Sequence, residues 1–246
     1  MKSFLAALQF LTIIPIPKGI KIEEKDLAGS VIFFPLVGLF IGGILMLIAI
    51  SLRKFLPILT LNLLLLLVWI GITSALHLDG LADTVDGLSG GKDKEEILRI
   101  MADSNIGAKG AIALILLLGA KYLFLYQLPF TLRNHALLLV PALGRWAMVL
   151  AAAFLPYAKE EGLGRIFVEN SGRREILLTS LLITVLGLLL IKFSFFYLLG
   201  GLLSATFLLL VIFKGRIGGI TGDNLGAINE IVEVVALLII ILGNSS

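Results

Sequence analysis

The sequence predicts an all-α, polytopic integral membrane helix bundle with about seven transmembrane helices and a short N-terminal interfacial or re-entrant helix. Three observations predict this fold class. Hydrophobic residues make up 59% of the chain and charged residues 15%, whereas a soluble domain carries about 25% charged residues. The mean hydropathy is +1.06. Apolar windows of roughly 20 residues, long enough to cross ~30 Å of hydrocarbon, recur along the sequence.

The N-terminal segment, MKSFLAALQFLTIIPIP, has an apolar run similar to the core of a signal peptide. No small-residue cleavage site follows it, so we expect the segment to be retained. Its apolar run of about 13 residues is too short to span a bilayer. Pro15 and Pro17 end it, because proline stops a helix. We therefore expect an interfacial or re-entrant helix here.

Seven apolar windows follow, and each is a predicted span: residues 31–52, 58–76, 111–130, 136–156, 176–191, 193–213 and 225–242. The turn at Lys192 is very short and the last window contains two glutamates, so six or eight spans are alternatives. In the first window, Gly38, Gly42 and Gly43 predict close helix packing. The sequence has no convincing repeat or linker, so residues 1–246 are predicted to form one membrane domain.

The loops between these windows fall on two sides that differ strongly in basic residues. One side collects Lys18, Lys21, Lys25, Lys92, Lys94, Arg99, Lys109, Lys159, Arg165, Arg173, Arg174, Lys214 and Arg216. The other side collects Arg53, Lys54, Arg133 and Lys192. The positive-inside rule predicts that the first side faces the cytoplasm, in a multi-pass inner membrane protein. The chain has no cysteine, which excludes disulfides and thiolate metal sites.

The most informative segment is HLDGLADTVDGLSGG, residues 77–91, on the predicted cytoplasmic side. On a helix, Asp79, Asp83 and Asp86 stand at i, i+4 and i+7 and share one face. Their carboxylates would repel one another unless a cation lay among them, which points to a divalent metal. The alternative is a solvated loop or helix cap. For His77, an interfacial histidine with a satisfied hydrogen bond is equally compatible.

Two further segments, MADSNIGAKGA and GGITGDNLGAINEIVE, combine glycine with acids on the same predicted side. Glycines let backbone N–H groups approach an anion closely. The candidate residues are Asp103, Ser104, Gly107, Lys109, Gly110, Thr221, Asp223, Asn224, Glu230 and Glu233. A helix end followed by a loop is the alternative for the first of these segments. The two glutamates are harder to dismiss, since intramembrane acids are costly and usually functional.

Arg145 stands alone in the window 136–156. It is either part of the functional site or a structural counter-ion to one of the acids. Together the three polar segments predict one site, where carboxylates hold Mg²⁺, with Mn²⁺ as the alternative, against substrate phosphates. This favours phosphoryl transfer, in which the protein mainly positions the reactants and neutralises charge.

The order of these blocks resembles the cobalamin synthase family, also called adenosylcobinamide-GDP ribazoletransferases. The resemblance rests on His77-Leu-Asp79-Gly80-Leu-Ala-Asp83-Thr-Val-Asp86-Gly87, on Asp103-Ser104-Asn-Ile-Gly107-Ala-Lys-Gly110 and on Gly219-Ile-Thr221-Gly222-Asp223-Asn-Leu-Gly226-Ala-Ile-Asn-Glu230. The N-terminal FLTIIPIP and the FPLVGLFIG that ends at Gly42 are similar to that family as well. The resemblance covers nearly the whole chain, and the first two blocks make it specific.

The resemblance implies a membrane-embedded, Mg²⁺-dependent enzyme of the last stage of coenzyme B12 assembly. It implies that adenosylcobinamide-GDP is joined to α-ribazole or its 5′-phosphate, with release of GMP, by attack of the ribose 3′ hydroxyl on the diphosphate. The expected partners are these substrates and the lipid bilayer, and not nucleic acid. The oligomeric state is left open.

On this scheme the candidate residues take hypothetical roles. The metal ligands are Asp79, Asp83, Asp86, Asp223 and Glu230, and His77 or an aspartate accepts the hydroxyl proton. The residues that contact the substrate or balance its charge are Asp103, Ser104, Gly107, Lys109, Gly110, Arg145, Thr221 and Asn224.

Three other functions compete with this one. Asp83-Thr-Val-Asp86-Gly87 fits the opening of the motif of CDP-alcohol phosphotransferases, but Ser89, Gly90 and Gly91 depart from its continuation. A cation-coupled transporter also combines glycine and acid in broken helices; its acids, however, lie at mid-membrane, whereas these cluster at one predicted surface. A structural membrane anchor would leave the aspartate spacing unexplained.

Overall fold

Helices make up nearly all the regular structure of residues 1–17 and 19–243, the part of the chain that the computed structural model describes. Lys18, counted in the predicted topology, lies outside these residues. The helices are α1 (Lys2–Leu11), α2 (Glu24–Ala28), the 3₁₀ helix η1 (Val31–Phe33), α3 (Phe34–Leu52), α4 (Ile58–Ile72), α5 (Leu76–Gly90), α6 (Lys94–Ile100), α7 (Ala108–Gln127), α8 (Phe130–Phe154), α9 (Leu163–Glu169), α10 (Arg173–Ile191), α11 (Ser194–Ile217) and α12 (Gly222–Leu242). The predicted all-α class is confirmed.

Six helices among the described residues are long and apolar enough to cross a bilayer, namely Val31–Leu52, α7, α8, α10, α11 and α12. α4 and α5 pass the same test together but are bent by 84°. The protein is therefore a multi-pass membrane protein, as predicted. Every predicted window overlaps a helix, but the window 58–76 runs past the end of α4 at Ile72 into the break before α5. α1 is a short helix of 10 residues, after which Thr12 is extended. Its place at the membrane interface stays a prediction.

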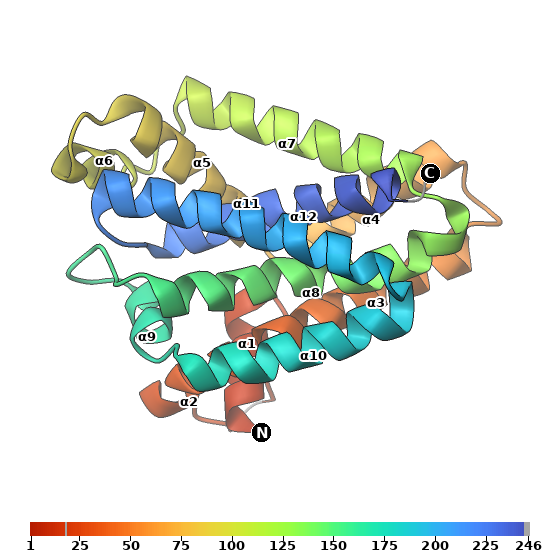
Figure 1. Ribbon diagram of the computed structural model, residues 1–246, viewed down its shortest axis with the longest axis horizontal. Helices are drawn as coiled ribbons and strands as arrows, with labels where there is room; N and C mark the ends of the chain where they lie inside the picture. Colours follow the sequence, from red (N-terminus) through yellow and green to blue (C-terminus); the bar gives the residue numbers. More distant parts are fainter. Residues whose placement is uncertain (18, 244–246) are drawn as a thin grey trace.

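The long helices lie side by side along the longest axis of the molecule, with α8 near the middle (Figure 1). α8 is 83% buried over its apolar window, whereas α10 is 17% buried. The interior is filled by the leucine, valine and alanine side chains of α8 and by the facing residues of α3 and α12. α8 is thus the central helix, and α10 presents most of its apolar surface to the outside.

The contact between α3 and α8 depends on two glycines. A Cβ atom on Gly38 would lie 2.5 Å from the carbonyl oxygen of Pro141, and one on Gly42 would lie 2.6 Å from the carbonyl oxygen of Leu137. A side chain at either position would therefore force the two helices apart. The prediction of close packing is confirmed for these two residues. It is wrong for Gly43, which faces open space.

The break between α4 and α5 sets the direction of α5. Ser74 and Ala75 have φ values of 50° and 56°, a left-handed conformation that costs energy for residues with a side chain. The backbone N–H of Ile13 donates to the carbonyl oxygen of Ile72 at 2.8 Å, which ties the break to the chain after α1. α5 consequently turns away from the axis of α4 and packs against α12 and α7.

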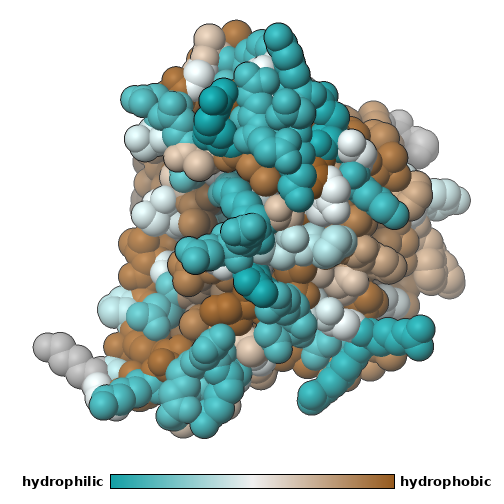
Figure 2. All heavy atoms as spheres, turned by 90° about the vertical axis from the view of Figure 1, so that its left-hand side faces the viewer, coloured by the Kyte–Doolittle hydropathy of each residue, from teal (hydrophilic) through white to brown (hydrophobic). Residues whose placement is uncertain are grey.

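One end of the bundle collects the polar segments. α5, α6, α9 and the turn between α11 and α12 lie at this end, on the left of Figure 1. Viewed from that side, the surface is covered in large part by hydrophilic side chains over an apolar body (Figure 2). The loops predicted to share the basic side therefore meet in space, and we call this the polar end.

Candidate active site

Three aspartates meet where α5 and the first turn of α12 come together at the polar end. Asp79 is exposed, and Asp83 and Asp223 are half-buried. α5 lies outside the six helices that span by themselves. Burial, together with the neighbouring carboxylates of Asp79 and Asp223, raises the pKa of Asp83 to about 6. We call Asp79, Asp83 and Asp223 the open acidic set.

Two glycines let the helices of this set approach each other. A Cβ atom on Gly80 would lie 2.7 Å from the carbonyl oxygen of Asp223. One on Gly226 would lie 3.1 Å from the Cα atom of His77. Each glycine thus removes the side chain that would separate α5 from α12, and the carboxylates of the two helices come within electrostatic reach of one another.

The loop after α8 adds a cation that the sequence analysis counted only as a topology signal. Lys159 Nζ lies 2.9 Å from Oδ2 of Asp223. Backbone hydrogen bonds of 2.9 Å in both directions hold this loop to Ile220, from Ala158 N–H to its carbonyl and from its N–H to the carbonyl of Pro156. Burial raises the pKa of Tyr157, the residue between them. The single signal for Lys159 in the sequence was that it lies in a loop on the same predicted side as the aspartates.

Asp86, a predicted metal ligand, is occupied differently. Its carboxylate accepts the backbone N–H groups of Gly107 at 2.7 Å and of Gly110 at 2.8 Å, at the start of α7. A Cβ atom on either glycine would run into this carboxylate. Asp86 therefore caps the N-terminus of α7 from another helix. The helix-cap alternative describes this aspartate, and Gly107 and Gly110 form its binding partner.

Of the other predicted residues of the second segment, Asp103 and Ser104 lie on the exposed loop before α7 and Lys109 lies in the first turn of α7. Asp103 accepts the backbone N–H of Asn105 at 2.9 Å and its side-chain amide at 2.8 Å, and these bonds lower the pKa of Asp103. Ser104 is exposed. Lys109 donates to the carbonyl oxygen of Ser89 at 2.8 Å and so ties α7 to the end of α5. In the structure as described, these bonds are local and none reaches the open acidic set.

Thr221 and Asn224, predicted to bind substrate, are fully buried and form the capping box of α12. The backbone N–H of Asn224 donates to Thr221 Oγ1 at 3.2 Å, and the backbone N–H of Thr221 donates to Asn224 Oδ1 at 3.0 Å. Asn224 also donates to Thr84 Oγ1 on α5 at 3.1 Å. The structure thus uses both residues to fix the start of α12, and with it Asp223, against α5.

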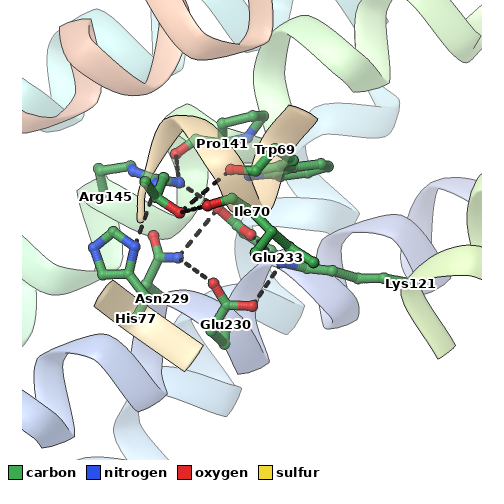
Figure 3. Close-up of polar contacts among 10 residues, drawn as sticks. Trp69, Ile70, His77, Lys121, Pro141, Arg145, Asn229, Glu230 and Glu233 are labelled. Atoms are coloured by element: carbon green, nitrogen blue, oxygen red, sulfur yellow. Dashed lines mark hydrogen bonds and ion pairs between the residues drawn. The ribbon is translucent and has the colours of Figure 1, made fainter. Parts of the chain in front are cut away.

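A second group of charges lies inside the bundle (Figure 3). Lys121 Nζ of α7 lies 2.7 Å from Glu230 and 2.5 Å from Glu233. Arg145 of α8 is ion-paired with Glu233. Each of the four side chains is at most 6% exposed. We call these four residues the buried charge cluster.

The cluster contains two cations and two anions, so its charges balance, as buried charges require. Asn229 donates to both glutamates at 3.2 Å, and Lys121 also lies 4.6 Å from the ring centre of Trp69. Arg145 is paired with Glu233, as the counter-ion alternative predicts, and its role toward substrate stays a prediction. Glu230, a predicted metal ligand, has both oxygens engaged by Lys121 and Asn229 and lies apart from the open acidic set. Lys121 was missed, although a lone lysine in an apolar window signals a buried acid.

His77 lies at the start of α5 and is 2% exposed. Its Nδ1 atom is 3.4 Å from a guanidinium nitrogen of Arg145. Arginine has no acceptor, so Nδ1 must be the accepting nitrogen and Nε2 must hold the proton. Nε2 has no hydrogen-bond partner among the described residues. The buried charge cluster therefore fixes the orientation of the His77 ring through Arg145. The Nε2–H of His77 stays free to donate a hydrogen bond.

The residues at the polar end suit a hard divalent cation by their donor chemistry. The open acidic set supplies carboxylate oxygens, which Mg²⁺ prefers, and Mg²⁺ needs only one or two of them when substrate phosphates and water complete its shell. No group of three or more His, Cys, Asp or Glu side chains in the described residues is close enough to hold a metal by itself. These residues therefore suit a cation that is bound by an anionic ligand at the same time.

The comparisons with known proteins agree with the sequence resemblance. An adenosylcobinamide-GDP ribazoletransferase from Clostridium botulinum (strain Langeland) is 38% identical over 98% of both chains. One from Acetivibrio thermocellus is 36% identical over 98% of both chains, and one from Caldanaerobacter subterraneus is 37% identical over 97% of both. No solved structure matches the chain. Residues 3–241 match the cobalamin-5-phosphate synthase family, and the chain belongs to this family.

Proposed function

We propose that the open acidic set is the place where this enzyme joins adenosylcobinamide-GDP to α-ribazole or its 5′-phosphate, releasing GMP. The family and the curated names of its relatives make the chain a transferase of the final step of cobalamin biosynthesis. The observation that supports the site is the meeting of Asp79, Asp83 and Asp223 with a single lysine, Lys159, at the polar end. A negative excess of this kind favours a cation and, through it, a diphosphate.

We propose Mg²⁺, with Mn²⁺ as the alternative, as the cation, held by one or two carboxylates from among Asp79, Asp83 and Asp223 together with the phosphates of the substrate. Such an ion neutralises the charge that spreads over the phosphoryl oxygens during transfer. Asp86 and Glu230 stay outside this ligand set because α7 and Lys121 engage their oxygens. They support the site by holding α7 and α12 in place.

In the reaction, the ribose 3′ hydroxyl oxygen forms a bond to the phosphorus that bears the cobinamide arm. The bond from this phosphorus to the bridging oxygen breaks, and GMP leaves with that oxygen. An aspartate of the open acidic set takes the hydroxyl proton, since His77 already holds a proton on its free nitrogen. Lys159, 2.9 Å from Asp223, balances the charge that develops on GMP.

We further propose that the polar end faces the cytoplasm, because it holds most of the basic loop residues and because nucleotides are cytoplasmic. The chain has no cysteine, so single cysteines report the orientation without background. Ser104→Cys at the polar end and Lys54→Cys at the opposite end are both exposed. A membrane-impermeant maleimide applied to intact cells should label only Lys54→Cys, and labelling of Ser104→Cys alone would reverse the orientation.

The activity itself is tested with purified protein in liposomes, adenosylcobinamide-GDP, α-ribazole or its phosphate, and a titration of Mg²⁺. GMP and a corrinoid product should form in equal amounts and should disappear when the metal is chelated. Product formation that persists in excess chelator would remove the metal from the proposal. No product with either acceptor would overturn the transferase function and direct the next assay to cation-coupled transport.

A further inference from the structure

A cavity of about 280 Å³ lies directly beside the open acidic set. It is lined by residues of α1, α5, α8 and α9, of the starts of α3 and α12, and of the loop between α8 and α9. Asp79, Asp223 and Lys159 line its polar part, and Phe34 and Phe167 line its apolar part. The roles expected for these residues, metal binding and charge balance, do not explain why a partly polar and partly apolar cavity lies at this place.

The apolar part is built of aromatic rings that are themselves held in the core. Phe34 is 1% and Phe167 is 2% exposed, and their ring centres are 5.3 Å apart. Phe10 of α1 completes the group, with its ring centre 4.4 Å from that of Phe167. Phe10 is only partly buried, so it presents aromatic surface to the cavity, with the buried rings of Phe34 and Phe167 beside it, and such a lining suits a flat aromatic ligand. The size is at the lower end of small-molecule pockets, which run to roughly 300–1,000 Å³, so the cavity fits a nucleoside and excludes a corrin ring.

His77 contributes a buried, directional polar group to the lining of the cavity. Its Nε2–H has no partner among the described residues. A buried donor left unpaired costs about 1–3 kcal/mol, and an acceptor atom on a ligand would recover this. Arg145 fixes the ring from the other side through Nδ1, so the donor is preorganised.

We propose that this cavity is the subsite for the base of the α-ribazole acceptor, with the benzimidazole ring against the aromatic lining formed by Phe10, Phe34 and Phe167 and its unsubstituted ring nitrogen accepting a hydrogen bond from His77 Nε2. The inference rests on the proposed function and names the place of one of its two substrates. It puts the ribose toward Asp79 and Asp223, where its 3′ hydroxyl meets the diphosphate. It also gives α1 and α9 a role as walls of the acceptor site.

The same chemistry disfavours guanine as the occupant. Guanine carries ring and amino N–H donors and a carbonyl acceptor on its edge, and the aromatic part of the cavity, lined by Phe10, Phe34 and Phe167, would leave these groups unpaired. Benzimidazole has a single acceptor nitrogen and an otherwise apolar edge. The aromatic part of the cavity, with His77 in its lining, matches that pattern, whereas Asp79, Tyr157, Lys159, Glu161 and Asp223 line the polar part.

The experiment is a cycle that combines one change in the protein with one in the ligand. The acceptors are α-ribazole and the matching α-ribosyl indole, in which a C–H replaces the ring nitrogen; the proteins are wild type and His77→Leu. The KM of each acceptor is measured from GMP release at saturating adenosylcobinamide-GDP. In wild type the indole should have a KM at least about tenfold higher, the size of one lost hydrogen bond. In His77→Leu the two acceptors should have nearly the same KM.

The cycle compares two acceptors on the same protein. A lower amount of folded His77→Leu protein therefore affects both acceptors equally and does not change the ratio of their KM values. An unchanged ratio in His77→Leu would overturn the contact, while wild-type turnover would still uphold the proposed function. No GMP release from wild type with either acceptor would instead be a failure of the function.

The aromatic wall is tested with Phe167→Leu, and Phe195→Leu is the matched control. Phe195 is also fully buried, at 0% exposure, but it packs against α10 at Gly187, away from the cavity. Phe167→Leu should raise the KM of α-ribazole about tenfold, the loss of ring stacking and apolar contact, and leave the KM of adenosylcobinamide-GDP unchanged. A rise confined to adenosylcobinamide-GDP would assign the cavity to the other substrate and overturn the inference.

Discussion

The helix α12 carries two kinds of acid, and the fold treats them in opposite ways. Asp223, in its first turn, is half-exposed and shares the polar end with Asp79 and Asp83, so three carboxylates face one ammonium group. Glu230 and Glu233, about two turns further along, are buried and fully balanced by Lys121 and Arg145. The sequence alone makes both groups look like candidates for a metal site.

The difference teaches that charge balance, and not acidity, separates the chemical site from the structural one. A balanced, buried set can stabilise the packing of α7, α8 and α12, but it offers no free oxygen to a ligand. An unbalanced set at a polar surface costs stability until a cation joins it. The proposed function therefore belongs to the open acidic set, and the buried charge cluster holds the helices that display it.

The strongest test of this comparison removes the cation of the buried charge cluster. Lys121→Met leaves two buried carboxylates with only Arg145 between them. We expect a loss of about 3–5 kcal/mol in the free energy of unfolding, measured by denaturant titration in detergent micelles. Lys54→Met, an exposed lysine at the opposite end, is the control and should change stability by less than about 0.5 kcal/mol. Equal stability of the two variants would show that the cluster is not structural.

The converse test neutralises one member of the open acidic set. Asp83→Asn keeps the size of the side chain and removes its charge. We expect the rate of GMP release to fall by about 10²–10³-fold, as when one electrostatic group of a transition-state site is removed. The unfolding transition should not move to lower denaturant, because like-charge repulsion is relieved. A variant with normal turnover would exclude Asp83 from the site.

A smaller effect is expected where α5 and α12 touch. Gly80→Ala places a methyl group against the carbonyl of Asp223, so α12 must shift. Overpacking of this kind costs about 1–3 kcal/mol, and turnover should fall as Asp223 moves. Gly43→Ala is the matched change in open space, and it should leave both turnover and the denaturation midpoint near those of wild type. If Gly80→Ala and Gly43→Ala had the same turnover and the same denaturation midpoint, the contact between α5 and α12 would not be needed for the site.

The smallest expected effect concerns the cap of α12. Thr221→Ala removes the oxygen that accepts the N–H of Asn224, and loss of such a cap costs about 1 kcal/mol. The denaturation midpoint should fall accordingly, and the KM values of both substrates should stay unchanged. A raised KM for either substrate would restore Thr221 to the substrate-binding residues that the sequence analysis proposed.

The spans were predictable because their signal is local. Every apolar window overlaps a helix, and the alternation of basic loops agrees with the loops that gather at the polar end. The break at Ser74 and Ala75 was not predictable, since neither is a glycine or proline and the left-handed turn depends on packing. The close packing of Gly38 and Gly42 was predicted correctly. Gly43 was included with them because it follows Gly42 in the sequence, but it points outward, and the spacing alone did not distinguish it from the packing glycines.

The site was only partly predictable, because several of its contacts join residues that are far apart in the sequence. The i, i+4, i+7 spacing placed three aspartates on one face, yet Asp86 caps α7 because a loop about 20 residues later folds back onto it. Lys159 reaches Asp223 across 64 residues through the pairing with Ile220. Lys121 pairs with Glu230 across 109 residues. Such pairings are set by the tertiary fold, and a single sequence does not display them.

The most direct test of the division between the two acidic groups is GMP release by Asp83→Asn and by the double variant Lys121→Met/Glu230→Gln, at saturating Mg²⁺. The double variant removes one charge of each sign and leaves Arg145 paired with Glu233. Our account predicts that it retains most of the wild-type turnover and the wild-type Mg²⁺ dependence, whereas Asp83→Asn loses turnover. A folded double variant that is inactive, beside an active Asp83→Asn, would contradict the account and place the metal within the bundle.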